Sequence, residues 1–342
     1  MTDEINKMGR REFLGITSMA GAATLITGAA GLSLGMVEVA GAATGSAGGA
    51  TQKFTFAILS DAHLWEMADH RFDAFLEDAV ADVNKMNPAP DFVAYMGDIA
   101  QSGKRTELEK GKKILSKLKV PMYVIPGEHD WYLDLGQAWR DLFGSPTWSF
   151  DHKGVHFIGM NSILVRDFWT AKGLTPHERM GVMEELEGHV AGLWGVREEQ
   201  LKWLANDVKN LPKNTPVVVF THTPLWDYYK RWGFATDDGA KVREVLAKFD
   251  RVMSYHGHVH QVVYNKVGNM SSVGCMSTSW PWPYPDDAMP FPEIRMMRSA
   301  PGDFKDGLGT QFVNLEKDSS GMVNFNSWSD NLTPAAKRGI KV

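Results

Sequence analysis

The sequence predicts an α/β fold, because short apolar runs of strand length alternate with segments of helical periodicity. Residues 54–59 and 91–96 are continuous apolar runs, and residues 70–87 between them carry apolar side chains at helical spacing. This alternation is typical of parallel strands joined by right-handed crossovers. The chain has 342 residues, enough to bury a large core in one sizeable domain or two small ones.

The composition excludes several classes of partner and site. The formal net charge is only −5, so we expect neither a nucleic-acid partner nor binding to an anionic membrane surface. The single cysteine, Cys275, excludes an intramolecular disulfide and a cysteine-based zinc cluster. The composition is therefore that of a soluble globular protein.

Residues 1–42 read as an export signal. Arg10 and Arg11, followed by phenylalanine and leucine, resemble the twin-arginine consensus, and residues 13–37 are uncharged. Residues 40–42 supply a small-x-small cleavage site, which favours a removed signal over the alternative of an N-terminal membrane anchor. We therefore expect the twin-arginine export machinery as a partner, no stable membrane anchor, and a periplasmic or otherwise extracytoplasmic location.

The rest of the chain divides by composition. Residues 43–53, rich in Gly, Ala and Ser, indicate a linker, and residues 54–328 form the expected domain before a tail at 329–342. Within the domain, residues 162–195 are an insertion, either a lid over a site or a plain surface excursion. Residues 276–309 are expected to be a tryptophan- and proline-rich loop.

Further elements follow the same pattern along the domain. We expect a helix at about 104–118, a strand at 120–125, a hairpin at 150–156 that leads into a strand through 160, a helix at 198–211, and strands at 216–220 and 251–254. Residues 261–266 and 269–275 indicate a hairpin of a second sheet, with further strands near 310–316 and 321–327.

Acidic and histidine side chains follow five of these strands, at the point where each strand ends. They are Asp61, His63, Asp98, Glu128, His129, Asp130, His222, His258 and His260. On an extended backbone, residues two apart point the same way, so Asp61 with His63 and His258 with His260 each aim at one point. Ligands of parallel α/β sheets bind outside the carboxyl ends of the strands. The pattern therefore predicts a site there.

The donor types indicate metal ions. A catalytic ion usually takes about three protein ligands, so the seven candidates other than His129 and Asp130 suit two ions that share a bridging carboxylate. Mixed imidazole and carboxylate ligands suit Fe, Mn, Zn, Co or Ni, and the absence of thiolates argues against a structural zinc.

The order of the motifs resembles that of the calcineurin-like metallophosphoesterase superfamily. In this chain the motifs D-x-H, G-D, G-x-H-D, H and G-H-x-H begin at residues 61, 97, 127, 222 and 257. The sequences around His222 and His258 look most like the class III cyclic nucleotide phosphodiesterase branch, and the resemblance covers about residues 54–275. It implies a four-layer α/β/β/α sandwich with two mixed sheets and a metal site at the strand C-terminal ends.

The resemblance also implies a role for each motif residue. Asp61, His63 and His260 would hold the first metal, His222 and His258 the second, with Asp98 bridging both, and His129 would contact the substrate phosphate or leaving group while Asp130 fixes its orientation. The implied function is that of an exported dinuclear phosphoesterase, with two Fe, Mn or Zn ions. It would hydrolyse small phosphate mono- or diesters by attack of a hydroxide that bridges the metals.

Two positions depart from the family pattern. Glu128 stands where the family usually has Asn as a ligand of the second metal, and Gln101 stands where Asp or Asn is common. Asp61, Asp98, Glu128 and a bridging hydroxide together carry a charge of −4, which cancels two divalent ions. Glu128 therefore either favours a trivalent ion such as Fe(III) or turns away and leaves the second site weak.

Glu128 also keeps two other classes of function open. The chain could be a non-hydrolytic metal- or ligand-binding protein on the same fold, or a mononuclear iron enzyme that uses a subset of the ligands.

Tryptophans recur beside the motifs, at Trp65, Trp131, Trp226 and Trp280. They are candidates for substrate binding, as an aromatic wall that stacks a planar leaving group, and ordinary core packing is the alternative.

Overall fold

The computed structural model describes residues 50–165, 173–184, 194–228, 234–281, 303–329 and 340–341. The expected export signal lies outside the described residues, as do most of the tail, part of the expected insertion and most of the tryptophan- and proline-rich loop. Among the helices of the described part, none has the length and apolar character needed to cross a lipid bilayer.

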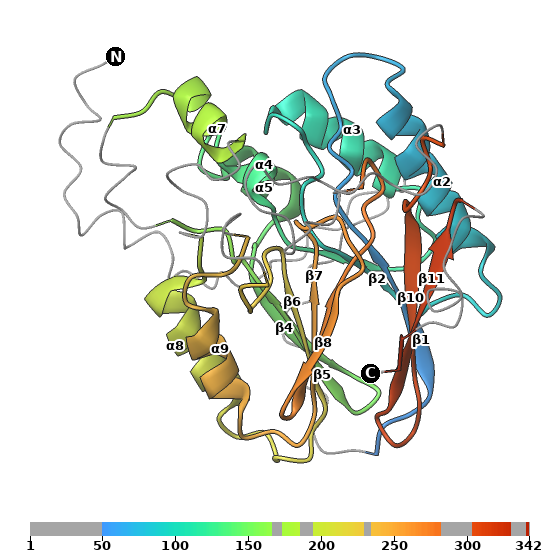
Figure 1. Ribbon diagram of the computed structural model, residues 1–342, viewed down its shortest axis with the longest axis vertical. Helices are drawn as coiled ribbons and strands as arrows, with labels where there is room; N and C mark the ends of the chain where they lie inside the picture. Colours follow the sequence, from blue (N-terminus) through green and yellow to red (C-terminus); the bar gives the residue numbers. More distant parts are fainter. Residues whose placement is uncertain are drawn as a thin grey trace, which may run out of the picture. The chain divides into compact units, whose positions relative to one another are not determined.

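Two six-stranded mixed sheets form the centre of the domain (Figure 1). The first has the strand order β12-β11-β10-β1-β2-β3, and its strands are β1 (Phe54–Leu59), β2 (Val93–Tyr95), β3 (Met122–Val124), β10 (Gly309–Leu315), β11 (Gly321–Ser327) and β12 (Ile340–Lys341). The second has the order β4-β5-β6-β7-β9-β8, and its strands are β4 (Trp148–His152), β5 (Val155–Met160), β6 (Val217–Thr221), β7 (Val252–His256), β8 (Tyr264–Val267) and β9 (Met270–Gly274).

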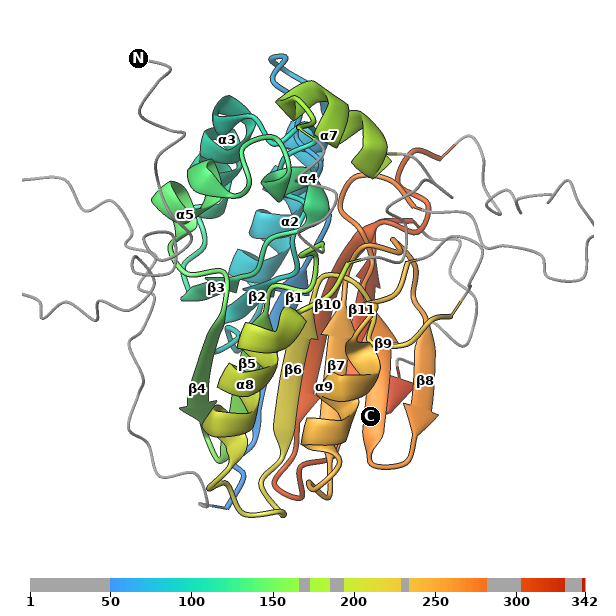
Figure 2. The ribbon, with the colours of Figure 1, turned by 90° about the vertical axis from the view of Figure 1, so that its left-hand side faces the viewer.

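The helices lie on the outer faces of the two sheets and at the carboxyl ends of their strands (Figure 1 and Figure 2). They are α2 (Arg71–Lys85), α3 (Arg105–Leu115), α4 (Glu128–Trp131), α5 (Gln137–Phe143), α7 (Pro176–Glu184), α8 (Arg197–Val208) and α9 (Gly239–Leu246). Figure 2 shows α8 and α9 across the strands of the second sheet, and Figure 1 shows α2 beside the first. The α/β class and the two mixed sheets expected from the sequence are confirmed.

The division of strands between the sheets differs from the expectation. The hairpin of β8 and β9 does not share a sheet with β10 and β11. Instead, β9 runs parallel to β7 in the second sheet, whereas β10 pairs antiparallel with β1 in the first. This pairing turns Val313 and Leu315 of β10 into the core between the sheets. The tail also contributes β12, which pairs with β11 and for which the sequence carries no signal.

Three apolar cores account for the order of the layers. Along β1, Ala57 and Leu59 face the core under α2, while Phe56 and Ile58 face the core between the sheets. A third core lies between the second sheet and the helices α8 and α9. The central core is rich in aromatic rings, and the ring centroids of Phe56 and Phe220, one from each sheet, are 6.0 Å apart. Helix, sheet, sheet and helix therefore follow one another, as the four-layer expectation requires.

Helix α7 belongs to the expected insertion and lies against the loop that follows α4. Arg179 of α7 donates to the backbone oxygens of Tyr132 (2.9 Å) and Leu133 (3.0 Å). Met180 of the same helix is buried. The described part of the insertion thus packs against the segment that follows Glu128 and His129 and stabilises it. A role of the insertion as a lid stays a prediction.

We predict that His156 makes the free energy of unfolding depend on pH. Its Nδ1 lies 2.7 Å from Asp151 of the neighbouring strand β4, and its Nε2 lies 2.9 Å from Asp207 of α8. Burial alone would lower the pKa of this imidazole, but the two carboxylates raise it above its ordinary value. Because the folded pKa exceeds the unfolded one, the stabilisation is complete below about pH 6.5 and is lost as the pH rises through the folded value.

Urea unfolding of the purified protein between about pH 5.5 and pH 9 measures this effect. The variant His156→Gln should lose that part of the pH dependence, and the exposed His177→Gln on α7 serves as the control. Equal pH dependence in the wild type and in His156→Gln would contradict the prediction.

Candidate metal centre

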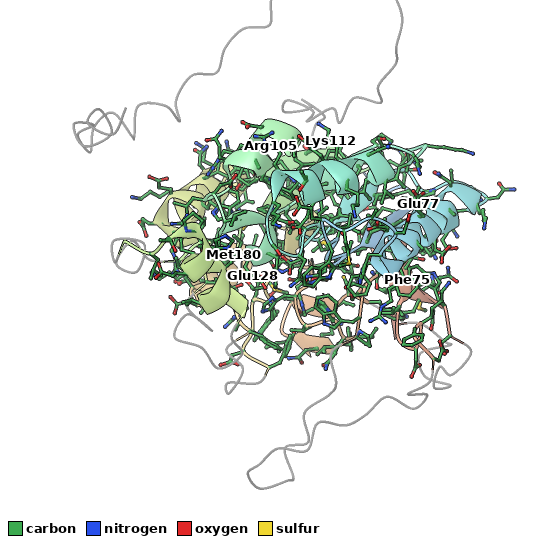
Figure 3. All side chains as sticks on the ribbon, turned by 90° about the horizontal axis from the view of Figure 1, so that it is seen from above. Phe75, Glu77, Arg105, Lys112, Glu128 and Met180 are labelled. Carbon is green, nitrogen blue, oxygen red and sulfur yellow. The ribbon has the colours of Figure 1, made fainter. Side chains whose placement is uncertain are left out.

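All seven expected metal ligands come together at the carboxyl ends of the strands, in two neighbouring groups. The first group is Asp61, His63 and His260, and the second is Asp98, Glu128, His222 and His258, with the donor atoms of each group within 4.8 Å of one another. Figure 3 labels Glu128 well inside the outline of the domain, whereas Arg105, Lys112 and Glu77 lie near its edge.

The first group joins residues from the ends of β1 and β7. Asp61 Oδ1 lies 3.2 Å from His260 Nε2, and the Nε2 atoms of His63 and His260 lie 3.1 Å apart. All three residues are buried, with at most 3% of the residue surface exposed. Asp61 and His63 thus belong to one group, as their spacing indicated. The common direction expected for His258 and His260 is wrong, because His258 belongs to the second group and His260 to the first. The expectation assumed an extended backbone, whereas these residues have a left-handed φ.

The second group is arranged around Glu128 at the start of α4. Glu128 Oε2 lies 3.0 Å from His222 Nε2, and Glu128 Oε1 lies 2.9 Å from His258 Nδ1. Glu128 thus points into the donor group, and the alternative in which it turns away does not hold. Without Asp98, each group has one carboxylate and two imidazoles.

Asp98 lies between the two groups. Its Oδ2 is 3.5 Å from His63 Nε2 of the first group and 3.1 Å from His222 Nε2 of the second. One buried carboxylate oxygen therefore reaches both groups, which is the position that a bridging ligand needs.

The donor atoms fit cations better than they fit one another. Several buried polar atoms of the second group have no hydrogen-bond partner among the described residues: Glu128 Oε2, His222 Nε2 and both ring nitrogens of His258. They remain unpaired although the Glu128 oxygens lie only about 3 Å from the two imidazoles. Buried polar atoms are almost always paired. Several lone pairs directed at one point are what a metal ion requires.

The outer nitrogens of three histidines support the same conclusion. His63 Nδ1 lies 3.0 Å from the Gln101 side-chain oxygen, His222 Nδ1 lies 2.6 Å from the Met96 carbonyl, and His260 Nδ1 lies 2.7 Å from the Trp280 carbonyl. Since these oxygens only accept, Nδ1 carries a hydrogen, and in the neutral ring each Nε2 has a lone pair that a metal ion can take. Metal-ligating histidines in proteins are held in this way.

Carboxylates and imidazoles of the second group lie close enough together to shift each other's pKa values. Burial alone would raise the pKa of Glu128, but His258 and His222 hold it well below its usual range. Burial alone would lower the pKa of His222, but Asp98 and Glu128 raise it well above its usual value. The carboxylates of Asp98 and Glu128 thus stabilise a positive charge between them. A metal cation can supply that charge in place of the proton on His222.

The backbone at the donors is strained. Five of the seven have φ in the left-handed region, at +46° to +63°: Asp61, His63, Asp98, His258 and His260. This conformation is uncommon for residues with a side chain and persists where the surrounding structure imposes it. Hydrogen bonds from Asp61 N to Gly97 O and from His63 N to Asp98 O, both 3.0 Å, hold the loops after β1 and β2 together.

Two glycines are required by close approach to the donors. Gly97 has φ of +97°, and a Cβ there would lie 2.6 Å from His222 Nδ1. At Gly257 the requirement is space, because a Cβ there would lie 2.8 Å from Asp61 Oδ2.

His129 lies beside both groups. A donor atom of its ring is within 4.8 Å of those of His63 and Asp98, and its Nδ1 is 2.6 Å from the Gln101 carbonyl oxygen. Asp130 accepts hydrogen bonds from Ala100 N (2.8 Å) and Gly127 N (3.0 Å). These contacts fix the loop that carries His129, so Asp130 acts on the ring through the backbone.

The four tryptophans fall into two pairs. Trp65 and Trp280 line a cavity beside the first group. Trp131 is buried beneath the guanidinium of Arg140 (4.4 Å to the ring centroid), and Trp226 packs under Arg243 (4.8 Å).

Some supporting residues carry no signal in the sequence. The hydroxyls of Ser277 and Ser279 donate to the Asp61 backbone oxygen at 3.0 Å and 2.6 Å, and Ser60 donates to the Asp61 carboxylate. Gln101 was noted only as a departure from a pattern, yet its side chain holds His63 and its backbone oxygen holds His129. Serines after a strand are too common to be singled out from one sequence.

Residues 54–262 match the family model for calcineurin-like phosphoesterases. The chain belongs to this family. It is a metal-dependent phosphoester hydrolase, as the order of the motifs indicated.

Two relatives agree with the phosphodiesterase-like branch. The chain is 26% identical over 220 residues to a probable glycerophosphodiester phosphodiesterase, GpdQ, of Arcobacter nitrofigilis, covering 61% of this chain and 74% of that protein. It is 21% identical over 235 residues to a 3′,5′-cyclic-nucleotide phosphodiesterase of Nostoc sp., covering 66% of this chain and 79% of that protein.

Solved structures agree with the fold. A dimetal phosphatase from Danio rerio superposes with a TM-score of 0.56 at 15% identity, covering 84% of this chain and 98% of that chain. A purple acid phosphatase from yellow lupin superposes with a TM-score of 0.52 at 12% identity, covering 83% of this chain and 53% of that chain.

We predict that Glu128→Asn changes the metal content and raises the turnover of aryl phosphates. An amide removes one negative charge, so the second group holds a cation less firmly while the phosphate meets a more positive site. Elemental analysis of the purified protein and steady-state kinetics measure the two effects. Glu128→Gln separates charge from side-chain length, and unchanged metal stoichiometry and rate in Glu128→Asn would rule the prediction out.

Proposed function

We propose that this protein is an exported dinuclear phosphoesterase that hydrolyses small phosphate mono- or diesters outside the cytoplasm. The observation that carries the proposal is the pair of buried donor groups that share the carboxylate of Asp98. Each group offers about as many protein donors as a catalytic metal usually takes.

The metals would be held by the residues expected from the sequence. Asp61, His63 and His260 would hold the first, Glu128, His222 and His258 the second, and Asp98 both. Carboxylate and imidazole donors suit Fe, Mn or Zn, and the extra charge of Glu128 favours a trivalent ion such as Fe(III) in the pair. When bound, two such cations supply positive charge at the phosphoryl oxygens and make a water molecule acidic enough to attack near neutral pH.

His129 would act on the leaving group. Its Nδ1 donates to the Gln101 carbonyl oxygen at 2.6 Å, which fixes the orientation of the ring beside the two donor groups. In the protonated ring, Nε2–H donates a proton to the departing oxygen as a general acid. Asp130 holds the loop, and the Asp98 Oδ1 that accepts from His129 N (3.0 Å) ties the acid to the bridging carboxylate.

The names of the relatives support a diester substrate. Both the GpdQ protein and the cyclic-nucleotide phosphodiesterase are named for phosphodiester cleavage. A diester leaves one alcohol and one phosphomonoester, so the alcohol half needs a place beside the donor groups.

Metal analysis of the purified protein, combined with hydrolysis of bis-aryl and mono-aryl phosphates, tests the proposal. We expect about two metal ions per chain and faster cleavage of the bis-aryl ester. Asp98→Asn should lose metal and activity together, whereas His129→Asn should keep the metal and lose roughly 10²- to 10⁴-fold in turnover. One ion per chain would favour a mononuclear enzyme, and a fully loaded but inactive wild type would favour a binding protein.

Export is tested separately. Replacing Arg10 and Arg11 by lysine should retain the precursor in the cytoplasm, because the twin-arginine pathway recognises the guanidinium pair. Cell fractionation with activity and immunoblot readouts measures the distribution. Arg105→Lys, at an exposed position of α3 in the folded domain, is the matched control, and export of the double variant at the wild-type level would contradict this part of the proposal.

A further inference from the structure

A cavity of about 400 Å³ opens beside the first donor group. It is lined by Trp65, Met67, His70, Arg71, Phe72, Gln101 and Trp280. Gln101 bonds His63 Nδ1 at 3.0 Å, and the ring centroid of Trp280 lies 4.0 Å from that of His63. Gln101 and Trp280 therefore line the cavity and also contact His63 of the first donor group.

Aromatic rings form a continuous arc along this cavity. The centroids of Trp65 and His70 are 6.3 Å apart, those of His70 and Phe72 are 4.4 Å apart, and those of Phe72 and Trp280 are 5.5 Å apart. Rings at these separations present flat faces and edges to whatever enters between them. Among the lining residues, Arg71 alone carries a permanent charge, and its guanidinium lies 5.3 Å from the Phe72 ring.

The loop that carries Trp65 is fixed although its side chains are exposed. Lys110 Nζ donates to the backbone oxygens of Trp65 (2.5 Å) and Met67 (2.8 Å) and to the Asp73 carboxylate (3.0 Å). Trp65 is nevertheless 40% exposed and Met67 58% exposed. Large apolar side chains held at a rim in this way mark a binding surface, because a fixed loop has little ordering entropy left to lose.

We propose that this cavity is the subsite for the alcohol half of the ester and that it selects alcohols with a flat aromatic ring, either an aryl group or a nucleobase. The inference rests on the proposed function, which places the phosphate at the donor groups. A polyol such as glycerol would exchange water for a wall of rings that offers it few hydrogen bonds. A flat ring gains stacking contacts and loses nothing comparable.

Binding to the purified protein with the metals that it retains tests the proposal, with adenosine 5′-monophosphate, phenyl phosphate and glycerol 3-phosphate as probes in isothermal titration calorimetry. We expect the two ring-bearing probes to bind about tenfold or more tightly than glycerol 3-phosphate. Tighter binding of the nucleotide identifies a nucleobase as the preferred ring, and tighter binding of phenyl phosphate identifies an aryl group.

Trp65→Ala should weaken the ring-bearing probes about tenfold and change glycerol 3-phosphate less than about twofold. Trp65→Phe should keep most of the preference. Tyr264→Ala is the matched control, because Tyr264 is 41% exposed on β8, in the other sheet.

Equal weakening of all three probes by Trp65→Ala, or none, would overturn the inference. If the wild type hydrolyses phosphate esters without a preference for ring-bearing probes, this inference fails and the proposed function stands. If ring-bearing probes bind through Trp65 but no ester is hydrolysed, the proposed function fails and the ring-binding cavity stands.

Discussion

The carboxylate of Asp98 ties the two halves of the structure together. Its Oδ2 lies within 3.5 Å of His63, which follows β1 of the first sheet, and within 3.1 Å of His222, which follows β6 of the second. A buried carboxylate is costly unless positive charge or donors surround it. The site therefore exists only while the two sheets keep their relative position, and the aromatic core between them, with Phe56 against Phe220, sets that position.

The same constraint explains the strain at the donors. A left-handed backbone at a residue with a side chain costs about 1–3 kcal/mol, and Asp61 and His63 both adopt it. Paired loop backbones and the hydroxyls of Ser277 and Ser279 on the Asp61 carbonyl oppose relaxation of this turn. The strained turns allow residues at the ends of extended strands to turn their side chains toward a common point.

The sequence was sufficient for what depends on local pattern. The apolar run 54–59 has the same bounds as β1, and the motifs named all seven donors that the structure brings together. The pairing of distant strands could not be predicted from the sequence. β9 pairs with β7, and β10 pairs with β1, and these pairings depend on which apolar side chains pack together in the folded core. The four-residue helix α4 and the eight-residue α9 are too short for a periodic signal, and His156 meets Asp207 only once α8 has packed on its sheet.

Glu128 gives the two donor groups the same composition. Apart from the shared Asp98, each has one carboxylate and two imidazoles, whereas an amide at position 128 would leave the second group one negative charge short. Attraction for a cation grows with the charge of its ligands, so the carboxylate strengthens cation binding at the second group. The same charge repels an incoming phosphate. At this position the chain therefore favours firm retention of the second cation over attraction for the substrate, and binding of the rest of the ester has to compensate for what the phosphate loses.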